Sequence, residues 1–143
     1  DPDRVIFADT CGYSEYLARL TNADLFLDTF NYNAGAVAND ALWCGLPVLT
    51  HQGQSYVARM VSSLLTAIDM PELITTTGDD YEQCALDLAT NSKKLKSIKA
   101  KLALNKDNTP LFNTEQFTSN LETAYTEMYK RYVNGEKPEH LLV

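Results

Sequence analysis

The sequence is poor in the residues that build metal sites and disulfide frameworks. Its 143 residues include only three cysteines and two histidines. Cys11, Cys44 and Cys84 have no CxxC spacing, and His51 lies far from His140. Zinc sites and disulfide-rich folds need more such residues at closer spacing. We therefore expect reduced thiols, no bound metal and a cytoplasmic protein.

Two further absences limit the choice of partners. No apolar run reaches the roughly 18 residues typical of a membrane-spanning helix, and no secretory signal is visible. No stretch is strongly basic, and 12 Lys and Arg against 19 Asp and Glu give a net charge of −7. Because nucleic-acid binding relies on clustered positive charge, we expect neither a nucleic-acid nor a membrane partner.

What the sequence does contain is one well-marked stretch near its middle. A short apolar run at residues 25–27 ends on Asp28, and turn-forming residues follow at 31–35. Residues 36–44 then have the composition of a helix that Gly45 ends, and residues 47–50 form a second extended run. This order predicts a βαβ unit, in which ligands bind at the carboxyl ends of the strands.

The start of the predicted helix suits a phosphate. Its first backbone N–H groups lack partners and carry partial positive charge. Gly35 has no Cβ and lets a ligand approach the backbone, and Asp40 could accept hydrogen bonds from ribose or sugar hydroxyls. One glycine before a helix is a weak motif. The alternative therefore stays open that residues 33–35 are only a turn and Asp40 only complements the helix dipole.

The residues before this unit predict a strand at 4–8, a loop at 9–12 and a helix at 13–22 with Ser14 as its cap. Tyr16 and Arg19 lie three residues apart and share a helix face. This pair could hold a planar base. The alternative is that Tyr16 packs on the sheet and Arg19 is solvated.

The residues after the unit predict further helices and one short strand. The helices are expected at 54–68, 80–90, from Asn91 onward, and from Asn113 to about 134, with the strand at 72–75 and a loop at 107–110. His51 could reach a ligand or be a surface loop residue, and the lysines at 93–101 favour a solvated face. The last helix has an apolar stripe that we expect to pack in the core, formed by Phe117, Leu121, Ala124, Tyr125, Met128 and Tyr132.

Strands separated by helices indicate an α/β fold with a Rossmann-like parallel sheet flanked by helices. We expect a partial Rossmann-like domain at residues 1–112, a helix at 113–134 packed on it, and a loose tail at 135–143. Because so few strands are present, we also expect further strands upstream of Asp1.

Three motifs give the chain a resemblance to a known family. They are DALWCGLPVLT at residues 40–50, RMVSSLL at 59–65 and PLFNTEQFT at 110–118. Over nearly its whole length the chain resembles the C-terminal end of the O-linked N-acetylglucosamine transferase family, which includes the SPINDLY-type protein O-fucosyltransferases.

The resemblance implies a GT-B fold, in which two Rossmann-like halves flank the active site and the C-terminal half binds the nucleotide-sugar donor. It implies transfer of a sugar, foremost N-acetylglucosamine from UDP-GlcNAc, to Ser or Thr of a protein acceptor, without a metal or other cofactor. The chain matches only the later part of the donor-binding half. The catalytic groups and a tetratricopeptide superhelix are therefore expected upstream, and the 143 residues alone are expected to be inactive.

Carried over by position, the resemblance assigns several residues to the nucleoside. The loop around Cys11 falls where family members offer backbone groups to the uracil edge. Tyr16 falls where many members have a histidine near the nucleotide, Arg19 matches an arginine near the base, and Asp40 matches an aspartate that accepts from the ribose.

The same carry-over places the diphosphate at Gly35, Ala36 and Val37, with Asn33 in the preceding loop also in the predicted donor-binding set. Ala36 and Val37 lack the hydroxyls that many members have there, and Tyr13 replaces a common lysine. The donor therefore stays open between a UDP-sugar and GDP-fucose. A second class of function stays open too, namely a non-catalytic nucleotide-binding or interaction module with a decayed donor site.

Overall fold

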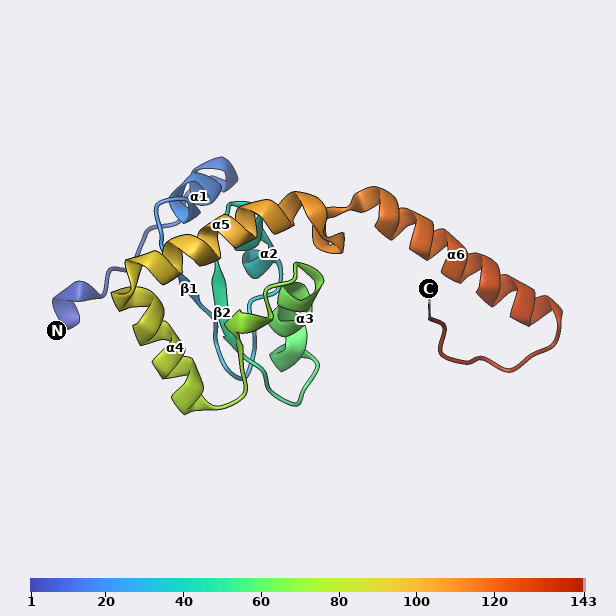
Figure 1. The fold of residues 1–143 in the computed structure, drawn as a ribbon. Helices are drawn as coiled ribbons and strands as arrows, with labels where there is room; N and C mark the ends of the chain where they lie inside the picture. The colour runs from blue at the N-terminus through green and yellow to red at the C-terminus, as the bar shows by residue number, and fades with distance from the viewer. Residues whose placement is uncertain (143) are drawn as a thin grey trace.

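The structure, a computed structural model, describes residues 1–142 and is built on a parallel sheet (Figure 1). Its strands are β1 (Phe26–Leu27), β2 (Val48–His51) and β3 (Ile74–Thr75), in the order β1-β2-β3. Both pairings are parallel, so the carboxyl ends of the strands meet at one edge. The predicted α/β fold and its βαβ unit are confirmed.

The helices lie on both sides of this sheet, with α4 on one side of the strands and α2 and α3 on the other (Figure 1). The six α-helices of the described residues are α1 (Tyr13–Leu20), α2 (Ala36–Trp43), α3 (Met60–Ala67), α4 (Gly78–Thr90), α5 (Ser92–Asn108) and α6 (Thr114–Val133). Short 3₁₀ turns occupy Pro2–Arg4, Val57–Arg59, Pro71–Leu73 and Pro110–Phe112.

The core forms around the middle strand. Val48, Leu49 and Thr50 are all fully buried, because helices cover both faces of β2. The other large buried side chains come from α2 to α5 and the turns between them, chiefly Leu42, Val61, Leu65, Ile68, Met70, Leu73, Leu88, Ile98 and Leu102.

Several helix ends form where local chemistry predicts them. Asn91 accepts a hydrogen bond from the Lys94 N–H at 3.1 Å, and Asn113 accepts one from the Gln116 N–H at 2.9 Å. Gly45 follows α2 with φ +80, a backbone conformation that favours glycine. The Ser14 cap is wrong, because α1 already begins at Tyr13 with Gly12 before it and no side-chain cap.

The predicted strand at residues 4–8 is also wrong. Val5, Ile6 and Phe7 are 63%, 86% and 92% exposed and have no regular secondary structure. A strand is stable only when its backbone groups pair with a neighbour. Within residues 1–142, β1 pairs with β2 alone, and no strand forms a ladder with residues 4–8.

Several predicted boundaries shift. The strand expected at 72–75 is shortened to Ile74–Thr75, because a 3₁₀ turn occupies Pro71–Leu73. The helix expected from residue 54 becomes a 3₁₀ turn at Val57–Arg59 followed by α3. The loop expected at 107–110 begins later, since α5 continues to Asn108. Thr109, which precedes Pro110, is extended at φ −123 and ψ 165, as the proline ring requires of the residue before it.

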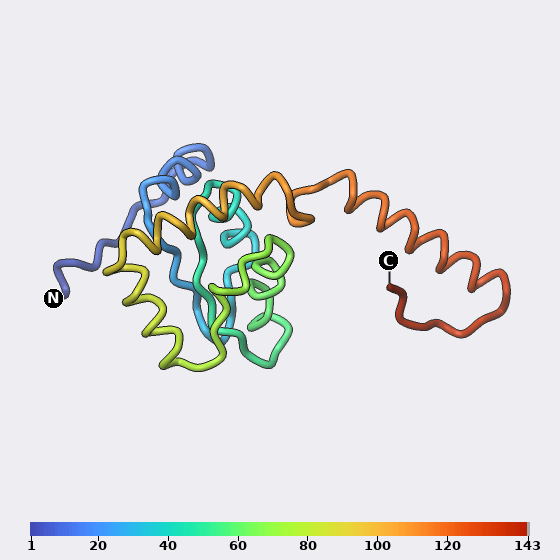
Figure 2. Tube along the Cα trace, viewed as in Figure 1, coloured from blue at the N-terminus to red at the C-terminus, as the bar shows by residue number. Residues whose placement is uncertain are grey.

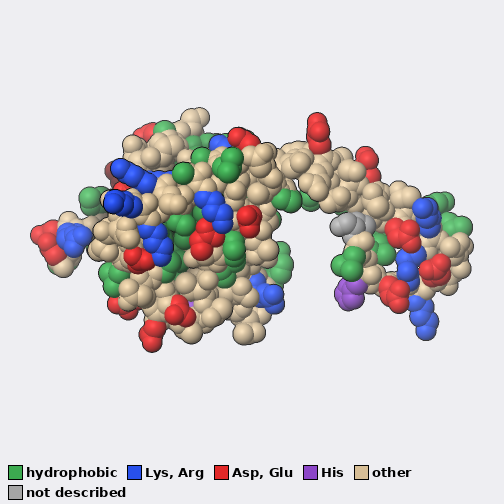
Figure 3. Space-filling view, in the orientation of Figure 1, with side chains coloured by type: hydrophobic (Ala, Val, Ile, Leu, Met, Phe, Trp, Pro, Cys, Tyr) green, Lys and Arg blue, Asp and Glu red, His purple; other side chains and the backbone are tan. Residues whose placement is uncertain are grey.

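Three of the five lysines at residues 93–101 pair with carboxylates, which agrees with a solvated face. Lys94 pairs with Asp87 at 2.5 Å, Lys99 with Asp24 at 2.7 Å and Lys101 with Glu72 at 2.9 Å. Figure 3 shows the same mixing of signs, with Lys and Arg lying among Asp and Glu over the visible face. These partly exposed pairs each contribute little to stability.

Helix α6 extends away from the rest of the molecule, and the chain after it turns back beside it (Figure 2). Phe117, Tyr125, Met128 and Tyr132 of its apolar stripe are 65%, 60%, 55% and 80% exposed, and no residue of α6 is buried. The prediction that this stripe packs in the core, on residues 1–112, is therefore wrong. The amphipathic pattern correctly predicts the helix, but it does not say which surface the stripe covers.

Among the described residues, no helix combines the length and apolar character needed to cross a membrane.

Candidate functional site

The candidate site lies where β1 and β2 end and α2 begins. The chain leaves β1 at Leu27, passes through residues 28–35 and enters α2 at Ala36. Gly35 is the residue before the helix, and no side chain caps this end. The first N–H groups of α2 therefore lack a capping acceptor from a side chain, and a helix end of this kind suits an anion.

Asp28 anchors the loop that leads to α2. Its side chain is buried, at 3% exposure, directly after β1. One carboxylate oxygen accepts from the Ala34 N–H at 2.8 Å, and the other accepts from the Thr50 hydroxyl at 2.6 Å. Asp28 therefore joins both ends of the loop to the middle strand of the sheet.

The loop is also tied to the segment that precedes α3. The Asn33 N–H donates to the Val57 carbonyl at 3.1 Å, and a Cβ on Gly35 would lie 3.4 Å from Met60 Cε. The Asn33 side chain is buried at 1% exposure; its amide nitrogen donates to the Thr29 carbonyl at 2.8 Å, while its Oδ1 has no partner. Asn33 is thus part of the loop's interior.

Helix α1 brings aromatic residues beside α2. The Tyr13 hydroxyl donates to Asp40 Oδ1 at 3.0 Å. This hydrogen bond is the main reason that the pKa of Tyr13 lies above its ordinary value, with burial and the Asp40 charge adding to it. The Tyr13 and Tyr16 rings lie 6.0 Å apart between centroids. The structure therefore places Asp40 next to an aromatic pair, with one carboxylate oxygen already bonded.

Tyr16 is half-buried, whereas Arg19 is exposed. The Tyr16 hydroxyl is buried without a partner, and burial raises the pKa of this phenol. Arg19 Nη1 donates to the Asp9 carbonyl at 3.0 Å, so Arg19 holds the loop at residues 9–12. Cys11 in this loop is a half-buried free thiol.

Two groups of predicted residues are thus connected through Asp40. Gly35, Ala36 and Val37 form the start of α2, whereas Cys11, Tyr16 and Arg19 belong to α1 and the loop before it. Helices α1 and α2 pack together, and the Tyr13–Asp40 hydrogen bond crosses their contact. The roles of these residues toward a donor stay predictions from the sequence.

Sequence reasoning missed an aromatic cluster at the same edge of the sheet. The Phe30 ring lies 4.9 Å from both the His51 and Tyr81 rings. The Tyr81 hydroxyl donates to the Asp28 carbonyl at 2.9 Å. His51 is the last residue of β2, not a loop residue, and its Nδ1 is buried without a partner.

It also missed the role of Asp28. The usable signal was a carboxylate directly after an apolar run, six residues before Ala34. The Thr50 hydroxyl comes from the next strand and could be placed beside Asp28 only with the register of β1 and β2.

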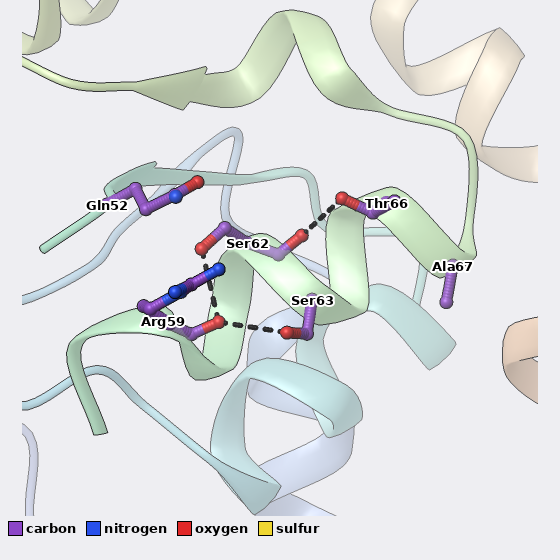
Figure 4. A pocket seen from close by; sticks show the side chains of 6 residues that line it. All are labelled: Gln52, Arg59, Ser62, Ser63, Thr66 and Ala67. Carbon is purple, nitrogen blue, oxygen red and sulfur yellow. Dashed lines mark hydrogen bonds between the residues drawn. The ribbon is translucent and has the colours of Figure 1, made fainter. Parts of the chain in front are cut away.

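A polar cavity of about 310 Å³ lies along α3, beside the end of β2 (Figure 4). The hydroxyls of Ser62 and Ser63 donate to the Arg59 carbonyl at 3.1 and 3.2 Å, and Thr66 donates to the Ser62 carbonyl at 2.8 Å. Their protons are therefore used within the helix. None of the predicted donor-binding residues lines this cavity.

Comparison with known proteins agrees with the fold. The chain is 33% identical over 143 residues to the probable UDP-N-acetylglucosamine–peptide N-acetylglucosaminyltransferase SEC of Arabidopsis thaliana, covering 99% of the chain and 15% of that protein. It is 31% identical to the UDP-N-acetylglucosamine–peptide N-acetylglucosaminyltransferase of Caenorhabditis elegans, covering 99% of the chain and 12% of that protein. The probable UDP-N-acetylglucosamine–peptide N-acetylglucosaminyltransferase SPINDLY of Hordeum vulgare is 34% identical over 115 residues, covering 80% of the chain and 12% of that protein.

A solved structure is similar too. A mutant O-GlcNAc transferase from Thermobaculum terrenum superposes with a TM-score of 0.78 at 30% sequence identity, covering 83% of this chain and 23% of that one. The α/β fold thus matches part of an O-GlcNAc transferase, consistent with a C-terminal part of a GT-B enzyme. The chain spans less than a quarter of the length of each of these relatives.

The model of the family described as "Glycosyl transferase family 41" matches residues 1–121, which is most of the chain. The parallel sheet, with the uncapped start of α2 after its first strand, agrees with this match. The chain belongs to glycosyl transferase family 41.

Proposed function

We propose that the chain is the donor-binding part of a protein O-glycosyltransferase, which transfers N-acetylglucosamine from UDP-GlcNAc to Ser or Thr of a protein. The observation that carries the proposal is the uncapped start of α2 at the carboxyl ends of β1 and β2, with Asp40 one turn into the helix. The names of the relatives as UDP-N-acetylglucosamine–peptide N-acetylglucosaminyltransferases support the choice of donor.

The start of α2 would stabilise the diphosphate as it leaves the sugar. Negative charge develops on the leaving group during transfer, and fixed N–H groups and a helix dipole stabilise such charge. Ala36 and Val37 contribute backbone N–H groups only, because their side chains have no hydroxyl. The proposal therefore needs no metal or other cofactor in this part of the enzyme.

The nucleoside would lie between α2 and α1. Asp40 has a second carboxylate oxygen beside the one that Tyr13 uses, and it would accept from a ribose hydroxyl. The Tyr16 ring and the remaining N–H groups of Arg19, which is exposed, would meet the base.

The remaining steps belong to parts of the enzyme outside these 143 residues. The proposal assigns the acceptor protein and the catalytic groups to them, because the GT-B cleft lies between two halves. We expect no turnover of UDP-GlcNAc by the 143 residues alone.

A second function, a module whose donor site has decayed, is favoured by one observation. The Tyr13 hydroxyl occupies one of the two Asp40 oxygens, which leaves fewer acceptors for a ribose. Residue 13 is also a tyrosine and not a lysine, so it adds no positive charge. Both functions share the fold, so nucleotide binding distinguishes them.

The test is calorimetric titration of UDP and of GDP into the 143-residue chain. We expect UDP to bind more tightly than GDP. Asp40→Ala and Arg19→Ala should each lower the affinity for UDP by about tenfold. Asp79→Ala is the matched control for Asp40→Ala, because Asp79 is an exposed carboxylate at the start of a different helix, α4. Equal UDP affinity in Asp40→Ala and Asp79→Ala would contradict the proposed site, and a folded chain that binds neither nucleotide would favour the decayed module.

A further inference from the structure

Asp28 is a buried carboxylate without a counterion. It is 3% exposed, and no Lys, Arg or His of residues 1–142 forms a salt bridge with it. Removing a carboxylate from water is costly unless hydrogen bonds replace its hydration. The groups that provide those hydrogen bonds are therefore held firmly in place.

Those groups come from two segments that must be fixed relative to each other. Asp28 Oδ1 accepts from the Ala34 N–H at 2.8 Å, at the far end of the loop, and Oδ2 accepts from the Thr50 hydroxyl at 2.6 Å, on the middle strand. The Asp28 N–H itself donates to the Leu49 carbonyl at 3.0 Å, so the residue is fixed to the sheet. Hydrogen bonds to a charged acceptor are stronger than those between neutral groups.

The position of Ala34 determines how α2 starts. Ala34 is two residues before Ala36, the first residue of the helix, and Gly35 between them has no side chain that holds it. A shift at Ala34 would therefore reorient the N–H groups from Gly35 to Val37. Those are the groups that the proposed donor diphosphate would contact.

We propose that Asp28 is a positioning residue of the donor site, which holds the loop at residues 29–35 against β2 and so sets the direction of the first N–H groups of α2. The inference rests on the proposed function. It assigns the Ala34 N–H to Asp28 and the N–H groups from Gly35 onward to the ligand.

Two threonines of neighbouring strands provide a matched comparison. The Thr50 hydroxyl donates to Asp28, whereas the Thr75 hydroxyl donates to the Thr50 carbonyl at 2.9 Å. Both side chains are buried, at 0% and 8% exposure. Thr50→Val and Thr75→Val each remove one buried hydroxyl at similar volume, but only Thr50→Val removes a partner of Asp28.

The experiment measures binding of UDP and of uridine to the 143-residue chain by NMR titration, for the parent, Asp28→Asn, Thr50→Val and Thr75→Val. We expect Asp28→Asn and Thr50→Val to lower the affinity for UDP about fivefold or more. The affinity for uridine should change less, because only the diphosphate of UDP would reach the start of α2. Thr75→Val should leave both affinities unchanged. Equal weakening of UDP by the two threonine variants, or equal weakening of UDP and uridine, would overturn the inference.

Hydrogen exchange of the amides at residues 34–37, without ligand, gives a second and independent result. We expect faster exchange there in Thr50→Val and Asp28→Asn than in Thr75→Val. If the parent chain binds neither UDP nor uridine, the proposed function fails, and exchange alone decides the role of Asp28 in holding the loop. Equal exchange rates in Thr50→Val and Thr75→Val would then overturn the inference that Asp28 holds the loop. If Asp28→Asn does not fold, the comparison of Thr50→Val with Thr75→Val tests the inference by itself.

Discussion

At the scale of single residues, one hydrogen bond controls what Asp40 offers a ligand. The Tyr13 hydroxyl donates to one oxygen of the carboxylate, and Tyr13 itself is exposed. Because a ribose carries two hydroxyls, one would bond the free Asp40 oxygen and the other would compete with the Tyr13 hydroxyl for the bonded one. Tyr13 thus reduces the free acceptors that Asp40 offers.

Tyr13→Phe should therefore tighten UDP binding about two- to fivefold, because the ring stays and the competing hydroxyl is removed. Calorimetry of UDP binding checks this. Tyr129→Phe, which alters an exposed tyrosine on α6, is the control and should change nothing. Weaker UDP binding in Tyr13→Phe would mean that the hydroxyl supports the site instead of competing for it.

A second residue-scale prediction concerns Tyr81 and alkaline pH. Burial, with a smaller effect from the Asp28 charge, raises the pKa of the Tyr81 phenol from 10.0 to about 12. The folded state thus holds this proton more tightly than the unfolded state. The contribution to stability is complete below pH 10.0 and is lost as the pH rises toward about 12.

The free energy of unfolding should therefore fall more steeply above pH 10.0 in the parent chain than in Tyr81→Phe. Denaturant unfolding at several pH values below and above this point measures the two slopes. Tyr129→Phe serves again as the control, and identical slopes in the parent and Tyr81→Phe would contradict the expectation.

At the scale of elements, the turn between β2 and α3 is tightly packed at Gly53. The Gly53 N–H donates to the Ala58 carbonyl at 2.9 Å, and a Cβ on Gly53 would lie only 2.7 Å from Ala58 Cβ. Neither atom belongs to a flexible side chain that could move away. The segment carrying Val57, to which the α2 loop is bonded, therefore depends on this glycine.

Gly53→Ala should lower the free energy of unfolding by about 1–3 kcal/mol, as overpacking of a close contact does. Gly78→Ala is the matched control, since a Cβ on Gly78, the first residue of α4, meets nothing within 4 Å. Denaturant unfolding of both variants measures the difference. Equal stability of the two variants would show that the turn relaxes without cost.

At the scale of the whole molecule, the chain consists of a packed body up to residue 112 and a helix that leaves it. The buried hydrophobic residues lie between Ala38 and Leu102, and α6 contributes none of them. Helix α5, in contrast, places Ile98 and Leu102 in the core. Stability should therefore depend on α5 and not on α6.

Removal of residues 113–143 should leave the free energy of unfolding unchanged to within about 1 kcal/mol. Removal of residues 92–143 should abolish cooperative unfolding, because large buried side chains are lost. Chemical denaturation of the two truncated chains tests this difference. A large loss of stability in the shorter truncation would mean that the stripe of α6 is covered in solution.

Local patterns predicted the parts of the molecule that depend on neighbours in sequence. The end of α2 at Gly45 and the caps Asn91 and Asn113 form as predicted, because each depends on hydrogen bonds within a few residues. The βαβ unit also forms as predicted, although its strands pair between residues far apart in the sequence. The motifs at residues 40–50, 59–65 and 110–118 likewise identified the family, which is a property of the sequence alone.

Tertiary structure decided the rest. Residues 4–8 have strand composition but stay unpaired, and the stripe of α6 has a core pattern but stays exposed, because pairing and burial require a partner surface that periodicity does not specify. The same holds at the site, where Arg19 bonds to Asp9 and Asp28 joins Ala34 to Thr50. The sequence by itself determined which elements form and which family they belong to, whereas contacts between distant segments decided which side chains hold the site together and which remain free for a ligand.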